Sequence, residues 1–303
     1  MNLAVELAGL RLKNPVLTAS GTFGYGVEFA PYGDLTELGG IVVKGLSWEP
    51  RKGNPMPRVA ETPCGMLNAI GLQNIGVHRF VEEKLPLLPW AEVPVIANLY
   101  ACDVEDFARL AEYLAEQEGV AALEVNISCP NVQAGGILFG QDPAQATRVT
   151  RAVKDRAGTR PVIVKLSPNV TDITSVAKAA ADGGADILAL INTLSGMAVD
   201  VRTRKPRLAN VIGGLSGPAI KPVGLRCVHQ VSRAVDLPII GLGGIASAED
   251  VLEYILVGAW AVQIGTANFL RPDTAFRIAA DLPQLLDELG VNSWEEFRGA
   301  LRA

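Results

Sequence analysis

Residues 238–266 read PIIGLGGIASAEDVLEYILVGAWAVQIGT and contain one complete structural repeat. Short runs rich in Ile, Val and Leu at the two ends have the length and composition of buried β-strands. Between them, Ser247 is a typical helix N-cap, and the acidic Glu249 and Asp250 favour the positive end of a helix dipole. A strand, a helix and a second strand in this order indicate the unit of a parallel sheet covered by helices.

The same alternation extends along the rest of the chain. Eight short apolar runs end in small or polar residues, and most of them precede a segment with helical periodicity. Eight repeats of strand and helix predict a (β/α)8 barrel, the TIM-barrel architecture of the α/β class. The predicted strands cover residues 15–20, 40–45, 94–99, 123–128, 162–167, 187–193, 238–244 and 261–266.

Three further segments complete the predicted fold. Alternating apolar residues within 3–12 indicate an N-terminal β-hairpin, which we expect to cover the bottom of the barrel. Residues 45–92 and 194–237 are too long for single helices and contain several prolines and glycines, so we expect two insertions over the top face. No linker or low-complexity segment interrupts the sequence, and we interpret residues 1–303 as a single domain.

The composition excludes several classes of function. Apolar residues make up 49% of the chain and the net charge is −5, which predicts a large buried core and no nucleic-acid surface. The two histidines and four widely spaced cysteines predict no metal site and no iron–sulfur cluster on this chain. The sequence has neither a signal-peptide pattern nor an apolar stretch of membrane-spanning length, which predicts a soluble cytoplasmic protein without membrane contact.

Active-site residues of a barrel lie at the C-terminal ends of its strands. The predicted ends are polar, rich in amides, and include two lysines, Lys44 and Lys165. Each lysine follows a Val/Ile run, and we expect each to reach an anion because burying an unpaired ammonium group is costly. No carboxylate stands at a predicted strand end.

The glycines that follow the last two strands predict an anion site. Gly243 and Gly244 end the seventh strand, and Gly265 and Thr266 end the eighth. Glycine lets backbone N–H groups approach an anion closely, and the loops after these two strands of a barrel often bind phosphate. Because the Walker and Rossmann patterns are absent from the sequence, a phosphate-tailed cofactor such as FMN fits better than NAD.

One cysteine has a context that indicates catalysis. Cys129 follows a strand end, lies close to two asparagines, and precedes a proline and a pair of glycines. A cysteine in this setting can act as a nucleophile or as a general base. A nucleophile usually needs a histidine, and His78 and His229 both lie in predicted helices, so we expect Cys129 to be the base. The cysteines that we expect to be buried and inert are Cys64, Cys102 and Cys227.

Taken in order, these motifs resemble those of the class 1 dihydroorotate dehydrogenase catalytic subunits. The resemblance extends from the N-terminal hairpin to the last barrel strand. Each motif is weak alone, whereas the ordered set, with every member at a strand end or in an insertion, is specific. The matching pieces are TASG at 18–21, VKG at 43–45, NAIGLQN at 68–74, NISCPN at 126–131, VKL at 164–166, INT at 191–193, GLSG at 214–217, GG at 243–244 and IGT at 264–266.

The resemblance implies FMN-dependent oxidation of (S)-dihydroorotate to orotate, a step of pyrimidine biosynthesis. It implies that Cys129 removes the C5 proton while the C6 hydride passes to flavin N5, and that the loop after Cys129 closes over the substrate. The residues implied to hold FMN are Ser20, Lys44, Gly45, Asn98, Asn126, Lys165, Ile191, Gly217, Gly243, Gly244, Gly265 and Thr266. The residues implied to hold the substrate are Lys44, Asn68, Ala69, Ile70, Gly71, Leu72, Asn126, Asn131, Asn192 and Thr193.

The chemistry of these side chains agrees with the implied roles. Asparagine amides match the alternating C=O and N–H groups of a dihydropyrimidine ring. Lys165, placed near the pyrimidine end of the flavin, would stabilise the negative charge of reduced flavin. Lys44 would pair with the substrate carboxylate.

Members of the resembled family differ in their electron acceptor. One type is a homodimer that reduces fumarate, and another pairs with an electron-transfer subunit that carries FAD and a [2Fe-2S] cluster and reduces NAD⁺. The sequence NVQAGG at 131–136 is similar to the NAD-linked class 1B type and lacks the Gly-Lys-Pro-Gln run of the fumarate type. The resemblance therefore implies FAD and the cluster on a partner subunit, in a heterotetramer of two catalytic and two partner chains.

Several alternatives stay open on the sequence alone. The redox alternatives are a fumarate-linked class 1A enzyme and a dihydropyrimidine dehydrogenase-like domain that acts on uracil or thymine. The membrane-bound, quinone-linked class is set aside because its base is a serine, whereas Cys129 stands at the base position here. A non-redox lyase or isomerase would instead use Lys44 or Lys165 as a Schiff base. A non-catalytic scaffold is the last alternative, and the polar strand ends argue against it.

Overall fold

The computed structural model describes residues 2–128 and 139–302. Eight parallel strands form one sheet in the order β3-β16-β15-β10-β9-β8-β7-β4. A bridge between Leu17 and Gly40 joins the first strand to the last and closes the sheet into a barrel, which confirms the predicted architecture. The strands are β3 (Val16–Thr18), β4 (Ile41–Val42), β7 (Val95–Leu99), β8 (Ala122–Asn126), β9 (Val162–Lys165), β10 (Ile187–Leu190), β15 (Ile239–Leu242) and β16 (Ala261–Ile264).

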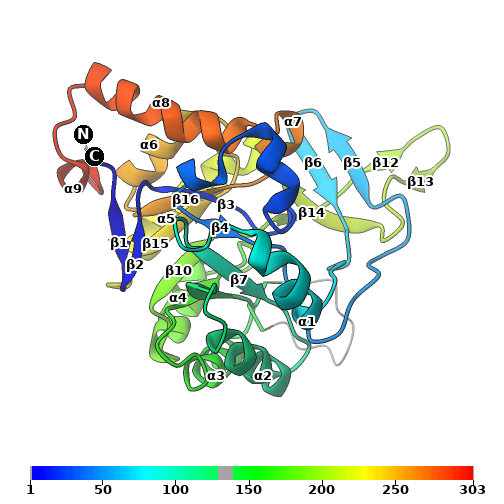
Figure 1. Ribbon diagram of the computed structural model, residues 1–303. Coiled ribbons are helices and arrows are strands. Elements are labelled where there is room, and N and C mark those ends of the chain that lie inside the picture. Colours follow the sequence, from blue (N-terminus) through cyan, green and yellow to red (C-terminus); the bar gives the residue numbers. More distant parts are fainter. Residues whose placement is uncertain (1, 129–138, 303) are drawn as a thin grey trace.

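Helices cover the outside of the barrel, so most strands are buried on both faces (Figure 1). Local sequence fixes where several of them begin. The side chains of Asp103, Asp142 and Asp172 accept hydrogen bonds from backbone N–H groups in the first turns of α2, α3 and α4. The α-helices are α1 (Val77–Arg79), α2 (Val104–Ala115), α3 (Pro143–Lys154), α4 (Ile173–Asp182), α5 (Lys221–Ser232), α6 (Ala248–Leu256), α7 (Ala267–Leu270), α8 (Thr274–Glu288) and α9 (Trp294–Phe297).

The predicted N-terminal hairpin is present as β1 (Val5–Leu7) and β2 (Leu10–Leu12). The leucine and valine side chains of the two strands are buried in the main core, whereas Glu6 and Arg11 point to solvent. In Figure 1 the hairpin lies on the side of the barrel opposite the inserted strands. The hairpin therefore covers the end of the barrel that is remote from the predicted site, as expected.

The two predicted insertions pair with each other, which the sequence did not reveal. The first supplies β5 (Val59–Thr62) and β6 (Gly65–Asn68), and the second supplies β11 (Leu194–Met197) and β14 (Ile212–Ser216). Together they form an antiparallel sheet in the order β11-β14-β6-β5. The central pairing places Gly214 opposite Asn68. A residue of the predicted substrate segment is thereby fixed against the other insertion.

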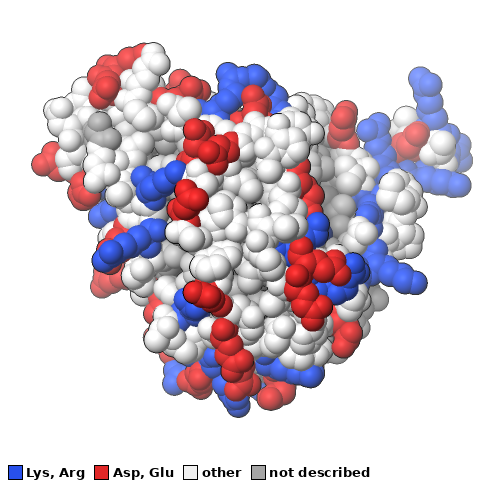
Figure 2. All heavy atoms as spheres, in the orientation of Figure 1, with Lys and Arg blue, Asp and Glu red and all other residues white. Residues whose placement is uncertain are grey.

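A second small hairpin extends from this inserted sheet. Strands β12 (Val199–Asp200) and β13 (Lys205–Pro206) pair with each other in antiparallel fashion and are largely exposed. Figure 2 shows lysine and arginine side chains gathered at this end of the molecule, whereas both signs of charge are interspersed over the rest of the face shown. The basic residues of the hairpin are Arg202, Arg204, Lys205 and Arg207.

Two of the cysteines that were predicted to be buried, Cys64 and Cys227, have different environments. Cys64 is exposed, so the prediction that it is buried is wrong. It lies in the turn that joins β5 to β6, and connecting segments of this kind run over the protein surface. Cys227 is buried as predicted, and burial raises the pKa of its thiol. Within the described residues, no helix is long and apolar enough to cross a membrane.

Candidate active site

The residues predicted to hold the cofactor gather at one end of the barrel. Because all eight strands run parallel, their C-terminal ends open at the same mouth. Most of the predicted residues lie in or directly after barrel strands: Ser20 after β3, Lys44 and Gly45 after β4, Asn98 in β7, Asn126 in β8, Lys165 in β9, Ile191 after β10, Gly243 and Gly244 after β15, and Gly265 and Thr266 after β16. Gly217 follows β14 of the inserted sheet.

Lys165 has the anion that was expected for it, and the anion is inside the barrel. Its Nζ lies 3.4 Å from Oε1 of Glu124 on the neighbouring strand β8. Glu124 is completely buried and Lys165 is 5% exposed. Sequence reasoning missed Glu124 because it lies within an apolar run rather than at its end. Its spacing of two residues from Asn126 was the available signal, because alternate strand residues share a face.

Asn98 presents an acceptor without a partner. Its amide nitrogen donates to Glu124 Oε1 at 2.7 Å, which leaves the amide oxygen free. That oxygen is buried and has no hydrogen-bond partner among the described residues. A side chain at Gly45 would place its Cβ 2.9 Å from the oxygen, so glycine keeps the neighbouring space open. A buried acceptor of this kind needs a donor from a bound molecule or an ordered water.

Lys44 differs from Lys165 in having no ion pair with any carboxylate in the described part of the chain. Burial lowers the pKa of its amine, and the nearby positive charge of Arg58 lowers it further. The expected anion is therefore not supplied by the described protein residues. A positively charged group held this way favours binding of an anionic ligand.

The glycine loop after β15 is closely packed, and a tyrosine of α6 hydrogen-bonds to its backbone. Gly244 has a left-handed φ of 72°, and a Cβ there would lie 2.9 Å from the carbonyl oxygen of Gly217. The hydroxyl of the buried Tyr254 donates to the carbonyl oxygens of Leu242 at 3.0 Å and Gly243 at 2.8 Å. Burial raises the pKa of Tyr254, which keeps the hydroxyl a donor. Sequence reasoning missed Tyr254, because it interprets an apolar helix position as simple core.

The asparagines predicted to bind the substrate form a partly buried amide group. Asn192 donates to the amide oxygen of Asn126 at 3.3 Å, and its own oxygen accepts from the backbone N–H of Thr193 at 2.8 Å. Asn68 donates to the carbonyl oxygen of Gly214 at 3.3 Å across the inserted sheet. These bonds fix the amides in place: the first joins β8 to the segment after β10, and the bond of Asn68 joins β6 to β14.

Two predicted residues, Cys129 and Asn131, lie outside the described residues. The chain reaches them from Ser128, whose hydroxyl donates to the carbonyl oxygen of Lys165 at 2.7 Å. The two histidines lie in α1 and α5 rather than at strand ends. Within the described residues, no group of three or more His, Cys, Asp and Glu side chains is arranged to hold a metal ion.

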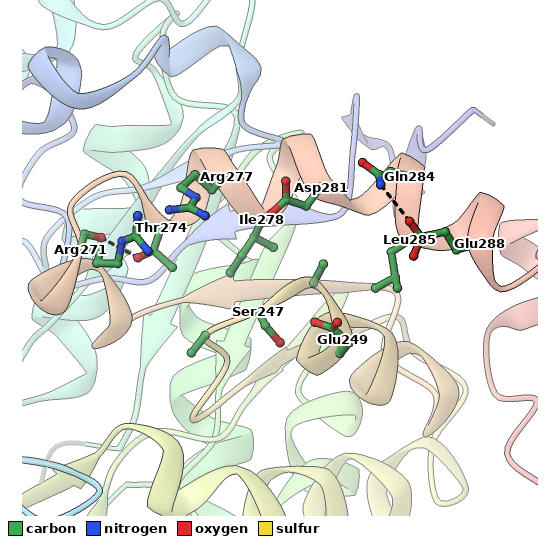
Figure 3. A pocket seen from close by; sticks show the side chains of 12 residues that line it. Ser247, Glu249, Arg271, Thr274, Arg277, Ile278, Asp281, Gln284, Leu285 and Glu288 are labelled. Carbon is green, nitrogen blue, oxygen red and sulfur yellow. Dashed lines mark hydrogen bonds between the residues drawn. The ribbon is translucent and has the colours of Figure 1, made fainter.

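A separate groove lies between the N-terminus of α6 and the side of α8 (Figure 3). It has a volume of about 340 Å³, and none of its lining residues belongs to the predicted site. Its charged side chains have both signs, with Arg271 and Arg277 opposed by Glu249, Asp281 and Glu288. Ser247 and Asp250 already cap the helix reciprocally, so the N-terminus of α6 has few free N–H groups. The strand ends, not this groove, carry the candidate active site.

The fold and the polar strand ends together define an enzyme of the (β/α)8-barrel class with its site at the C-terminal mouth. Residues 2–286 match the family model for dihydroorotate dehydrogenase. The chain is 71% identical over 302 residues to the dihydroorotate dehydrogenase B (NAD(+)) catalytic subunit of Solidesulfovibrio magneticus, covering 100% of this chain and 99% of the relative.

Two further relatives carry the same name. The protein of Maridesulfovibrio salexigens is 68% identical over 302 residues, with 100% of this chain and 99% of the relative covered. The protein of Pelobacter propionicus is 59% identical over 300 residues, with 99% of this chain and 98% of the relative covered. The chain therefore belongs to the dihydroorotate dehydrogenase family, which confirms the resemblance found in the sequence and makes it an oxidoreductase.

Proposed function

We propose that this chain oxidises (S)-dihydroorotate to orotate with FMN, as the catalytic half of an NAD-linked enzyme of pyrimidine biosynthesis. Family membership and relatives named as the NAD(+)-linked catalytic subunit support the proposal. The structural observation that carries it is a pair of polar groups at the barrel mouth: within residues 2–128 and 139–302, the buried amide oxygen of Asn98 has no hydrogen-bond partner and the ammonium group of Lys44 has no ion pair.

The residues at the mouth fit FMN. The buried oxygen of Asn98 needs a donor, which the imide N–H of a flavin ring offers. The loops after β14, β15 and β16 offer close-packed backbone at Gly217 and Gly244, and at Gly265 the nearest atom to an added Cβ would be the Cβ of Ala19, at 3.5 Å. Such backbone suits a phosphate group. Bound FMN would supply the acceptor for the hydride that leaves C6 of the substrate.

The remaining polar residues suit the substrate. The ammonium group of Lys44 would bind the carboxylate of dihydroorotate, because no described carboxylate neutralises it. The amides of Asn68, Asn126 and Asn192 would hold the ring through its alternating C=O and N–H groups. Cys129 would take the proton from C5 as general base, and Asn131 would add a further amide.

Electrons would leave through a second protein. The relatives are named catalytic subunits of an NAD(+)-linked enzyme, and that name implies an additional subunit. We propose that this partner carries FAD and a [2Fe-2S] cluster, that two copies of each chain form a heterotetramer, and that the complex is cytoplasmic. Widely spaced cysteines on this chain support placing the cluster on the partner.

Spectroscopy of the purified complex tests the proposal. The protein should be yellow, and its flavin absorbance should bleach when dihydroorotate is added anaerobically. Copurification with a flavin and iron–sulfur partner, followed by turnover with NAD⁺ and not with fumarate, would support the NAD-linked assignment. A colourless protein that cannot be reconstituted with FMN, and whose lysine is trapped on substrate by borohydride, would contradict the proposal and favour a Schiff-base enzyme.

A further inference from the structure

Among the residues that the structure describes, the interior of the barrel holds one buried carboxylate, Glu124, which has no part in the proposed chemistry. Glu124 lies in β8 directly opposite Asn98 in β7, and both side chains are completely buried. Carboxylates are rarely buried unless they are paired and hydrogen-bonded. Glu124 must therefore have partners inside the barrel that compensate its charge.

Three side chains from three other strands hold the carboxylate in place. Asn98 of β7 donates to Oε1 at 2.7 Å, and Gln263 of β16 donates to Oε2 at 2.5 Å. Lys165 of β9 lies 3.4 Å from Oε1. Each oxygen of Glu124 thus has at least one donor, and the carboxylate has little freedom to turn.

Lys165 depends on this carboxylate more than Glu124 depends on the lysine. Glu124 has two amide donors besides the ammonium group. The only charged group that contacts Nζ of Lys165 in the described part of the chain is Glu124, because its other contact, Oε1 of Gln263 at 3.3 Å, is neutral. Without the carboxylate, a buried ammonium group would favour losing its proton.

The position of Lys165 connects this pair to the cofactor site. Lys165 is the last residue of β9, directly opposite Asn126 at the end of β8, whereas Glu124 lies two residues deeper in the barrel. The lysine therefore stands between the buried carboxylate and the mouth.

We propose that Glu124 is a positioning residue of the cofactor site, which supplies the counter-charge of Lys165 and fixes its ammonium group at the barrel mouth. The inference rests on the proposed binding of FMN at the mouth. With FMN bound, the ammonium group of Lys165 would favour the anionic reduced flavin over the oxidised form. Glu124 contacts neither cofactor nor substrate and acts only through the lysine.

The test is the affinity of the apoprotein for oxidised and for reduced FMN between pH 6 and pH 9, measured under anaerobic conditions. Glu124→Gln keeps the size of the side chain and removes its charge. At pH 6 the variant should prefer reduced FMN at least as strongly as the wild type does. At pH 9 its preference should be about tenfold weaker than that of the wild type, equivalent to about 30 mV for a two-electron couple.

Two further variants serve as controls. Lys165→Met should prefer reduced over oxidised FMN about tenfold less than the wild type does at every pH, because the charge of the lysine is absent throughout. The double variant E124Q/K165M removes both charges, leaves no unpaired buried ion, and should behave like Lys165→Met. If E124Q does not fold, the comparison of the double variant with Lys165→Met still tests the claim, because a residue that acts only through the lysine should have no further effect once the lysine is replaced.

Each result has a distinct meaning. A ratio of affinities in E124Q that matches the wild type at every pH would overturn the inference, as would a double variant whose preference for reduced FMN differs from that of Lys165→Met. A purely structural role of Glu124 would weaken the affinities for oxidised and for reduced FMN equally in E124Q and leave their pH dependence unchanged. That result would also contradict the inference. Failure of the wild-type apoprotein to bind FMN would instead refute the proposed function itself.

Discussion

The ends of β4 and β9 each carry a lysine after a Val/Ile strand, and the two sites treat that charge in opposite ways. Lys165 is neutralised from within the barrel by Glu124. Lys44 has Arg58 as its charged neighbour, and burial together with that positive charge lowers the pKa of its amine. A lysine that the protein neutralises can act on a cofactor that stays bound. A lysine left without a counter-ion is suited to an anionic substrate that comes and goes.

This comparison gives both lysines electrostatic roles and leaves proton removal to Cys129. Cys129→Ser should slow reduction of the flavin by dihydroorotate by about 10²–10⁴-fold at neutral pH, because a serine hydroxyl is a far weaker base. FMN should stay bound. Stopped-flow absorbance under anaerobic conditions measures the rate. Wild-type kinetics in the serine variant would mean that another group, such as one of the lysines, removes the proton.

The same comparison predicts that replacing Lys165 lowers the stability of the protein far more than replacing Lys44. Lys165→Met leaves Glu124 buried without its charged partner and should lower the free energy of unfolding of the apoprotein by about 3 kcal/mol or more. Lys44→Met removes a desolvated charge that has no counter-ion among the residues that the structure describes, and should leave stability within about 1 kcal/mol of the wild type. Denaturant unfolding of the two variants measures the difference. Equal losses would show that Lys44 also has a stabilising partner.

The pH dependence of ligand binding sharpens the contrast further. The pKa of Lys44 lies below its ordinary value, so the free enzyme loses this positive charge at a lower pH than an exposed lysine would. Affinity for the anionic product orotate should fall as pH rises through that pKa, by up to tenfold per pH unit. Lys44→Arg keeps its charge and should reduce this fall. A profile that is the same in both proteins would exclude Lys44 as the anion-binding group.

Much of the fold was predictable because its signals are local. Apolar runs of strand length indicated the eight barrel strands, and the capping residue Ser247 indicated where α6 begins. The inserted sheet was not predictable, because the bond from Asn68 to Gly214 joins residues 146 positions apart. Nothing in either short strand specifies the other as its partner.

Functional side chains at strand ends were predictable from the sequence, whereas those deeper in the barrel or in a helix were not. Lys165 was expected to have an anion, but Glu124 was hidden inside an apolar run. The hydroxyl of Tyr254, which holds the glycine loop, occupies an ordinary core position of a helix. The predicted roles of Cys129 and Asn131 stay predictions.

The central claim is that Lys44 recognises the substrate carboxylate while Lys165 serves the cofactor. The direct measurement is the rate of anaerobic flavin bleaching with dihydroorotate and with dihydrouracil, which lacks the carboxylate. Wild type should strongly prefer dihydroorotate. In Lys44→Met that preference should fall by about 10–100-fold, as expected for loss of a charged hydrogen bond, whereas in Lys165→Met it should stay near the wild-type value. An unchanged preference in Lys44→Met, or an equal loss in both variants, would contradict the account.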